Sequence, residues 1–194
     1  MNLGIMQPYF IPYIGYWQLM AAVDEYVIYD NIQYTKKGWI NRNRILQNGS
    51  DTYITLPLKK DSDYLDVVDR YISDTFDRKK LLNQIFSNYK KAPFFEETYE
   101  LITDVVNYEE NNLFRFIYNS IIMIKKHLDI NTELIISSTL PVDHSLKGQD
   151  KVIDICKKLH ATEYYNAIGG MELYSKEKFN KHSCLKHSVC ILLQ

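Results

Sequence analysis

The apolar and polar positions of the chain follow two periods, one typical of buried strands and one typical of helices. Apolar runs bounded by turn residues predict strands at 3–6, 25–30, 132–140, 162–168 and 186–194. A helical spacing begins at Ile14, with Pro12 suited to a first helical turn. The order strand, helix, strand at the start of the chain favours a parallel pair joined by a right-handed crossover.

The middle of the chain has the helical period. Helices are predicted at 77–92, which ends before Pro93, at 94–106, at 111–128 with Asn111 or Asn112 as its cap, and at 148–160. A hairpin is predicted between 42–46 and 52–58, with its turn at 48–50. The stretch 59–73 fits neither period.

These elements predict a single α/β domain over residues 1–194. Its sheet is mainly parallel with flanking helices and comes from both ends of the chain, and a mostly helical insertion at about 76–129 separates the two sheet-forming halves. The topology is Rossmann-like, with a nucleotidyltransferase-like variant as the open alternative.

Composition narrows the class of protein. A net charge of −1 gives no case for general nucleic-acid binding or for an anionic membrane surface. The three cysteines have no CxxC spacing, which favours a reducing compartment. The start of the chain has no basic region and reaches Pro8 too early for a signal peptide, and the apolar runs are too short for membrane insertion. We therefore expect a cytoplasmic protein.

The polar segment 30–46, DNIQYTKKGWINRNRIL, is the most informative stretch for function. It combines cations (Lys37, Arg42), amides (Gln33, Asn41, Asn43) and aromatic rings (Tyr34, Trp39). Such side chains suit a ligand that carries phosphate, a ring and hydroxyls, for example a nucleotide-linked sugar. The alternative is a polar hairpin connection with incidental charges.

Two turns that follow predicted strands are further candidates. Gln7 ends the first strand, where open α/β sheets bind ligands, but the turn has no GxGxxG or P-loop pattern. Tyr13 and Tyr16 stand where nucleotidyltransferases carry histidines, so that chemistry is not supported; the alternative is a helix start packed by aromatic rings. Gly169 and Gly170 allow a backbone to approach a ligand, or simply make a turn.

Candidate catalytic groups are few. Asp30, at a strand end beside the polar segment, is the best-placed acid to bind an amine or accept a proton, and His144 is the one histidine suited to a general base. His182 and His187 flank Cys184 but lack the ligand spacing of a zinc site. No metal and no cofactor is predicted.

Six segments, read in order, resemble the WbqC-like protein family: QPYFIPYIGYWQLM, VDEYVIYDNIQYTKKGWINRNRI, TLPL, RKKLL, YKKAPFFEE and KLHATEYYNAIGGMELY. The resemblance implies a cytoplasmic protein encoded with bacterial O-antigen and other surface-polysaccharide enzymes, and transfer of an aminoacyl group, glycyl in one form, onto an amino sugar. By position it implies these family-like polar residues: Gln7, Tyr9, Tyr13, Asp30, Gln33, Tyr34, Lys37, Trp39, Asn41, Arg42, Asn43, Asn166, Gly169 and Gly170. Relatives continue past the last strand, so a short variant, or a site lacking one wall, is expected here.

The leading hypothesis is an aminoacyl or acyl transferase acting on a nucleotide-linked amino sugar, with an activated donor on an unknown carrier. Lys37 and Arg42 would hold the diphosphate, Trp39 or Tyr34 would stack on a ring, and Asp30 or His144 would take the proton of the amine. The alternatives are a non-catalytic sugar-nucleotide or glycan-intermediate binding protein and a nucleotidyl- or adenylyl-transferring enzyme. We also expect the segments around Gln7, Lys37–Asn43 and Asn166–Gly170 to line one cleft.

Overall fold

The structure is a computed structural model, and it describes residues 1–167, 175, 179 and 186–190. The chain divides into two compact units. The first unit consists of Met1–Gln7, Pro12–Asn31 and Asp129–Gln194, and the second consists of Pro8–Ile11 and Ile32–Leu128.

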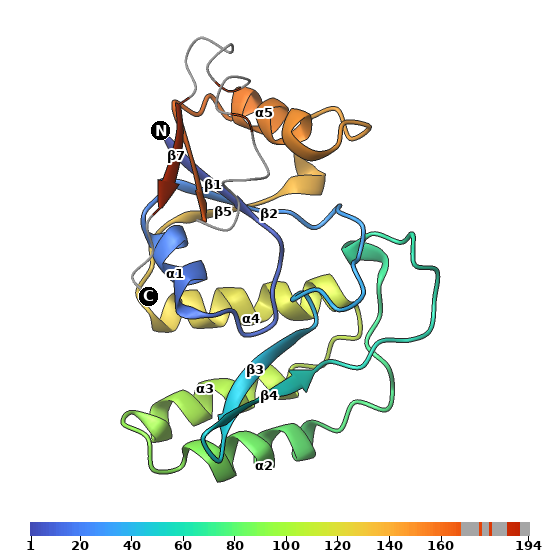
Figure 1. Cartoon of the computed structure of the whole chain (residues 1–194), viewed down its shortest axis with the longest axis vertical. Helices are drawn as coiled ribbons and strands as arrows, with labels where there is room; N and C mark the ends of the chain where they lie inside the picture. Colours follow the sequence, from blue (N-terminus) through green and yellow to red (C-terminus); the bar gives the residue numbers. More distant parts are fainter. Residues whose placement is uncertain (168–174, 176–178, 180–185, 191–194) are drawn as a thin grey trace. The chain divides into compact units, whose positions relative to one another are not determined.

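The first unit contains a five-stranded parallel sheet in the order β5-β2-β1-β6-β7, which confirms the predicted fold class (Figure 1). Its elements are β1 (Asn2–Met6), α1 (Ile14–Ala21), β2 (Glu25–Ile28), β5 (Glu133–Ile136), α5 (Gly148–Lys158), β6 (Glu163–Ala167) and β7 (Lys186–Cys190). The segments before and after the predicted helical insertion thus build one sheet, and this strand order is that of doubly wound Rossmann-like folds.

The two faces of the sheet are covered by different helices. Side chains alternate between the faces, so Leu3 and Ile5 share one core with α5, whereas the neighbouring Tyr26 ring meets Tyr16 of α1 at 5.4 Å between centroids. The connection from β1 through α1 to β2 runs towards the β5 edge of the sheet, and the connection from β5 through α5 to β6 runs in the opposite direction, towards the β7 edge. Right-handed crossovers in opposite directions place these helices on opposite faces, as Figure 1 shows.

Two element boundaries differ from the predicted ones. The strand predicted at 132–140 ends at Ile136, because Ser137–Thr139 form a short 3-10 turn. Pro12 lies two residues before α1 rather than in its first turn, and its carbonyl accepts a hydrogen bond from Trp17 Nε1 (3.2 Å).

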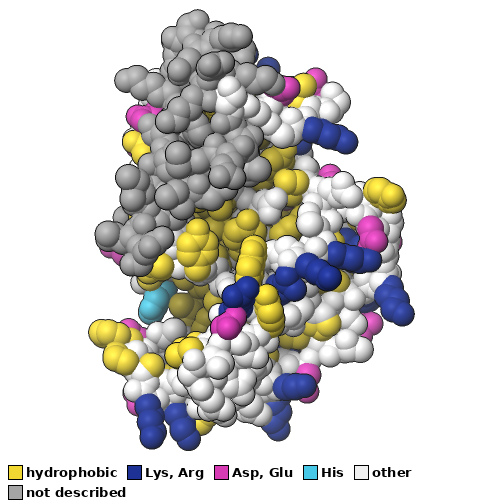
Figure 2. Space-filling view, viewed as in Figure 1, with side chains coloured by type: hydrophobic (Ala, Val, Ile, Leu, Met, Phe, Trp, Pro, Cys, Tyr) yellow, Lys and Arg dark blue, Asp and Glu magenta, His cyan; other side chains and the backbone are white. Residues whose placement is uncertain are grey.

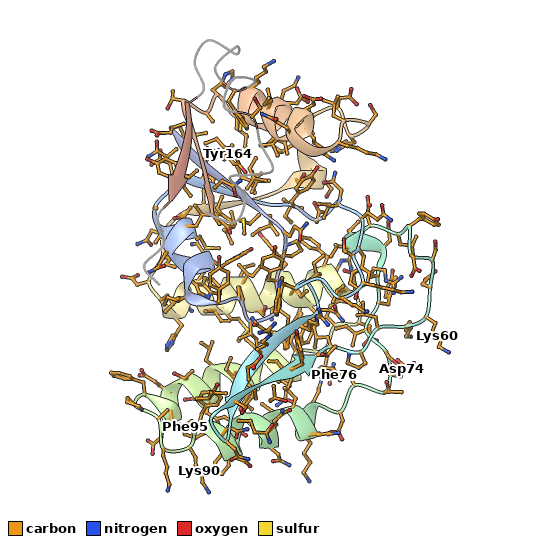
Figure 3. All side chains as sticks on the ribbon, viewed as in Figure 1. Lys60, Asp74, Phe76, Lys90, Phe95 and Tyr164 are labelled. Carbon is orange, nitrogen blue, oxygen red and sulfur yellow. The ribbon has the colours of Figure 1, made fainter. Side chains whose placement is uncertain are left out.

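The core beside α5 contains Tyr164 of β6, whose ring stacks on Phe179 with 5.4 Å between centroids (Figure 3). Val152, Ile153 and Cys156 of α5 are buried in this core. Burial in these apolar surroundings raises the pKa of the Cys156 thiol to about 12.

Cys156 is therefore expected to resist thiol reagents until the fold opens. With a pKa of about 12, only about one thiol in ten thousand is ionised at pH 8, and the thiolate is the reactive species. The measurement is labelling of a Cys184→Ser/Cys190→Ser variant with a chromogenic disulfide reagent, with and without denaturant. Rapid labelling in native buffer would contradict the prediction.

Gly4 lies where β1 passes closest to Tyr26. A Cβ at this position would lie 2.9 Å from Tyr26 Cδ2 and 3.2 Å from its Cε2, and Tyr26 is fully buried. Because the ring has no space to move into, Gly4→Ala is expected to lower the free energy of unfolding by about 1–3 kcal/mol, the usual cost of overpacking. Urea denaturation checks this, and a change below about 0.5 kcal/mol would show that the sheet yields.

The second unit contains the predicted hairpin, formed by β3 (Arg42–Gln47) and β4 (Ser50–Thr55). Asn48 and Gly49 join the strands with positive φ values of 50° and 79°, the geometry that an Asn-Gly turn favours. The strand predicted to reach residue 58 ends at Thr55, since Pro57 has no N–H to continue the pairing. The stretch 59–73 contains the 3-10 turn Val67–Asp69 and isolated β-bridges at Asp66, Tyr71 and Ile72.

Three helices complete this unit and confirm the predicted insertion: α2 (Arg78–Tyr89), α3 (Phe95–Asn107) and α4 (Leu113–His127). Asp77 Oδ1 accepts a hydrogen bond from Lys80 N (2.8 Å) and caps α2. Asn112, rather than Asn111, caps α4, because its Oδ1 accepts from Arg115 N (3.0 Å). No helix in the described part of the chain is long and apolar enough to cross a membrane.

Candidate functional site

The carboxyl edge of the sheet in the first unit is the natural place for a ligand. The strand order reverses between β1 and β6, and doubly wound folds bind ligands at this edge. Gln7 directly follows β1, and Asn166 lies near the end of β6, where its Oδ1 accepts a hydrogen bond from Ala167 N (2.8 Å). Gly169 and Gly170 lie outside the described residues.

Asp30 is the most informative side chain at this edge. It follows β2 and is 0% exposed. Its Oδ1 accepts a hydrogen bond from Ser138 N (2.9 Å), in the turn that follows β5. Its other oxygen, Oδ2, is buried without a hydrogen-bond partner among the described residues. Native proteins rarely leave a buried carboxylate oxygen without a hydrogen-bond donor. Asp30 Oδ2 is therefore suited to accept a hydrogen bond from a bound ligand.

Asn31 connects the same strand end to His144. Its Oδ1 accepts a hydrogen bond from Ser137 Oγ (2.8 Å), so its amide nitrogen faces His144 and donates to Nδ1 (2.9 Å). With Nδ1 acting as an acceptor, the neutral ring carries its proton on the exposed Nε2. In this arrangement His144 is a hydrogen-bond donor at the edge rather than a free base. The structure thus brings both predicted catalytic residues to the carboxyl ends of β2 and β5.

The first turn of α5 places a cation in this region. Lys151 is almost fully buried, with its Nζ 5.1 Å from the centroid of the Tyr29 ring. Hydrogen bonds from Ser145 lower the pKa of Asp143, and the charge of Lys151 adds to this effect. Sequence reasoning missed Lys151, because one Lys in an amphipathic helix looks like a solvated residue.

Several polar residues of the second unit hold the polar segment in place. The Tyr34 hydroxyl donates to Asn41 Oδ1 (2.9 Å), and Asn41 Nδ2 donates to the Leu56 carbonyl (2.8 Å). Tyr34 is buried, which raises its pKa, and its ring lies 4.9 Å from Cζ of the buried Arg70. Trp39 is consequently better placed than Tyr34 to stack on a ligand.

The remaining predicted binding residues have varied surroundings. Gln33 Nε2 donates to the Asp63 carbonyl (3.0 Å), and Asn43 Nδ2 donates to the Phe10 carbonyl (3.4 Å) and to the Ile11 carbonyl. Lys37 is exposed and has a positive φ of 66°. In the predicted set, Tyr9 is partly buried in the second unit, whereas Tyr13 is exposed in the first.

Trp39, Arg42, Arg44 and Tyr53 form a cluster that we term the arginine–aromatic platform. The Trp39 and Tyr53 rings stack with 6.2 Å between centroids and an interplanar angle of 27°. The Arg42 and Arg44 Cζ atoms lie 4.8–5.7 Å from the ring centroids. Trp39 is 41% and Tyr53 46% exposed, and Figure 2 shows Lys and Arg side chains beside exposed hydrophobic ones. Sequence reasoning found Trp39 and Arg42, but missed Tyr53.

Arg42 and Arg44 make different contacts in the platform. Arg42 Nε donates to the Gly38 carbonyl (2.9 Å), and its Nη2 donates to the Lys37 carbonyl, so Arg42 fixes the loop before β3. Arg44 instead donates to the Tyr53 hydroxyl (3.2 Å) and pairs with Asp51 (3.0 Å). The hydrogen bond with Tyr53, followed by the charge of Asp51, raises the pKa of Arg44.

The predicted residues therefore gather at two places, each within one unit. The sheet edge holds Gln7, Asp30, His144 and Asn166, and the segment around the hairpin holds Lys37–Asn43. Their convergence on one cleft stays a prediction. Among the described residues, no group of three or more His, Cys, Asp or Glu side chains is arranged to hold a metal ion.

Comparison with known proteins gives two matches. The model of the WbqC-like protein family matches residues 7–187. An uncharacterized protein of Mycobacterium tuberculosis, Rv1507c, is 28% identical over 184 residues, which is 94% of this chain and 79% of that protein. No solved structure matches.

Proposed function

The chain belongs to the WbqC-like protein family, and we propose that it is a cytoplasmic transferase of bacterial surface-polysaccharide (O-antigen) biosynthesis. The proposed reaction joins an activated amino acid, such as glycine, or another acyl group to the amine of a nucleotide-linked amino sugar. The proposal combines the setting that the family resemblance implies with the chemistry available at the sheet edge.

The observation that carries the proposal is that Asp30 Oδ2 is buried without a hydrogen-bond partner in the part of the chain that the structure describes. An enclosed carboxylate oxygen without a donor costs about 1–3 kcal/mol. An amine reaching this oxygen would supply the missing hydrogen bond and then lose a proton to it. Ser138 N holds the other oxygen, which fixes the orientation of the carboxylate.

The proposed step is amide formation by acyl transfer. The amine nitrogen forms a bond to the acyl carbon while the bond from that carbon to the oxygen or sulfur of the carrier breaks. One N–H proton of the amine passes to Asp30 Oδ2 and from there to the departing carrier atom. His144, with its proton on Nε2, donates a hydrogen bond to the acyl oxygen as negative charge develops there.

The polar segment has a separate role in the proposal. The platform, together with Lys37, would bind the nucleotide part of the substrate through ring stacking and charge-assisted hydrogen bonds. Because Tyr34 is buried against Asn41, the stacking role falls to Trp39.

A mass-based assay tests the function. The purified protein is incubated with nucleotide-linked amino sugars and with thioester, phosphate-anhydride and tRNA-linked forms of glycine, and the sugar product is weighed by mass spectrometry. The expected result is the mass gain of one acyl residue on the amine with one donor class. The absence of any gain across all these donors would refute acyl transfer.

A second function, binding without turnover, is favoured by the exposed rings of the platform, which can hold a ligand independently of Asp30. Thermal-shift measurements with the same sugars separate the two functions. Stabilisation without product in the mass assay supports a binding protein, and product formation excludes it.

A further inference from the structure

Asp51 occupies the place that an anionic ligand would take on the platform. Asp51 lies on β4, and its Oδ2 is 3.0 Å from Arg44 Nη1. Both side chains are largely exposed, and pairs of this kind contribute only about 0–1 kcal/mol to stability. Arg44 can therefore exchange this carboxylate for a phosphate at little cost, whereas Arg42 remains fixed to the Gly38 carbonyl.

The exposed rings indicate the second half of the ligand. Trp39 and Tyr53 keep much of their surface in solvent although they stack on each other, and exposed aromatic faces are the usual platforms for nucleobases. Aromatic faces beside two guanidinium groups suit a flat ring joined to a group with more than one negative charge.

The charge pattern of the unit argues for a single nucleotide rather than a nucleic-acid strand. Strand binding needs a continuous basic groove, yet Lys36 and Lys59 of this unit are each paired with an acid: Lys36 with Asp63 (2.8 Å) and Lys59 with Asp74 (3.4 Å). The net charge of the chain is −1. A compact ligand with one base and a diphosphate fits this surface better.

We propose that the arginine–aromatic platform is a nucleoside diphosphate site in which the base stacks on Trp39 and the diphosphate displaces Asp51 from Arg44. Asp51 then acts as a built-in competitor that lowers affinity for the diphosphate. Binding of a nucleoside diphosphate at the platform does not depend on the proposed function. Only the identity of the complete ligand, a nucleotide-linked sugar, rests on that function.

The test is calorimetric titration of the full chain with UDP and ADP at low salt. At least one of them is expected to bind, with uridine, adenosine and pyrophosphate each about tenfold weaker or more, because each offers only half of the contacts. Arg44→Gln is expected to weaken the binding about tenfold, on the scale of a charge-assisted hydrogen bond. Trp39→Ala is expected to weaken it about 5–100-fold through lost stacking.

Asp51→Asn gives the sharpest result, because it should strengthen binding by about two- to fivefold, the weight of an exposed ion pair. The matched control is Asp74→Asn, which makes the same change in net charge but releases Lys59, outside the platform (Asp74 is labelled in Figure 3). The control should leave the affinity unchanged. Circular dichroism verifies that each variant is folded.

Three results would overturn the inference: no binding of UDP or ADP at millimolar concentration, unchanged affinity in Arg44→Gln, or equal strengthening by Asp51→Asn and Asp74→Asn. Failure of the proposed function looks different. Platform-dependent UDP or ADP binding without any acyl transfer refutes the transferase and leaves the nucleotide site intact. Transfer that is insensitive to UDP, ADP and Arg44→Gln refutes the nucleotide site and leaves the transferase intact.

Discussion

Replacing Asp30 with asparagine is expected to slow amide formation about 10²–10⁴-fold, the usual contribution of a positioned general base. The asparagine oxygen still accepts the hydrogen bond from Ser138 N, so the turn after β5 keeps its anchor. The group at the Oδ2 position becomes an NH₂, which cannot take a proton from the amine. Initial rates from the mass assay, with the variant and the unchanged chain at equal concentration, measure the effect.

Asp24→Asn is the matched control for this experiment. Asp24 precedes β2 at the opposite end of the same strand, and its Oδ2 accepts a hydrogen bond from Asn2 N (2.7 Å). Like Asp30, Asp24 accepts a hydrogen bond from a backbone N–H. Unlike Asp30, it does not lie at the carboxyl edge of the sheet. Equal rates for Asp30→Asn and Asp24→Asn, both folded, would remove Asp30 from the mechanism.

Replacing Phe116 with alanine is expected to lower the free energy of unfolding by about 3–5 kcal/mol. Phe116 is buried on α4, and its ring centroid lies 6.2 Å from Phe10, 6.2 Å from Phe76 and 6.5 Å from Tyr108 (Phe76 is labelled in Figure 3). These rings come from separate segments of the second unit, so the surroundings cannot easily collapse into the cavity. Urea denaturation followed by circular dichroism measures the loss.

Ile122→Ala provides the control on the same helix. Ile122 is substantially exposed, so its truncation should change stability by no more than about 0.5 kcal/mol. A loss below about 1 kcal/mol for Phe116→Ala would mean that the aromatic cluster of the second unit repacks around the gap.

The sheet was predictable because its signal is local. LGIM, EYVIYD and TEYYNA are short apolar or aromatic runs with turn residues after them, and α5, which connects β5 to β6, carries a clear apolar stripe. Strand ends were less predictable. The strand expected at 132–140 ends early because Ser138 N bonds Asp30, a residue 108 positions away in the chain. Such a long-range hydrogen bond leaves no periodic signal in the sequence.

The candidate site was predicted in its composition but not in its contacts. Asp30 and His144 were found from their positions after strands, yet Asn31, which bonds His144, looked like one more amide of the polar segment. Arg42 was expected to bind phosphate, whereas the structure engages it with loop carbonyls. Tyr53 was overlooked because a tyrosine in a strand is typical of any hairpin.

The interleaving of the two units has a consequence for the chain as it leaves the ribosome. β2 is complete at Ile28, but its sheet neighbour β5 begins only at Glu133, about 100 residues later. At a synthesis rate of roughly 5–20 residues per second, about 5–20 s pass between the synthesis of β2 and that of β5. Meanwhile nearly all of the second unit emerges in one piece and can pack first. The apolar early strands are therefore the segments that a ribosome-bound chaperone would have to shield until the last third of the protein arrives.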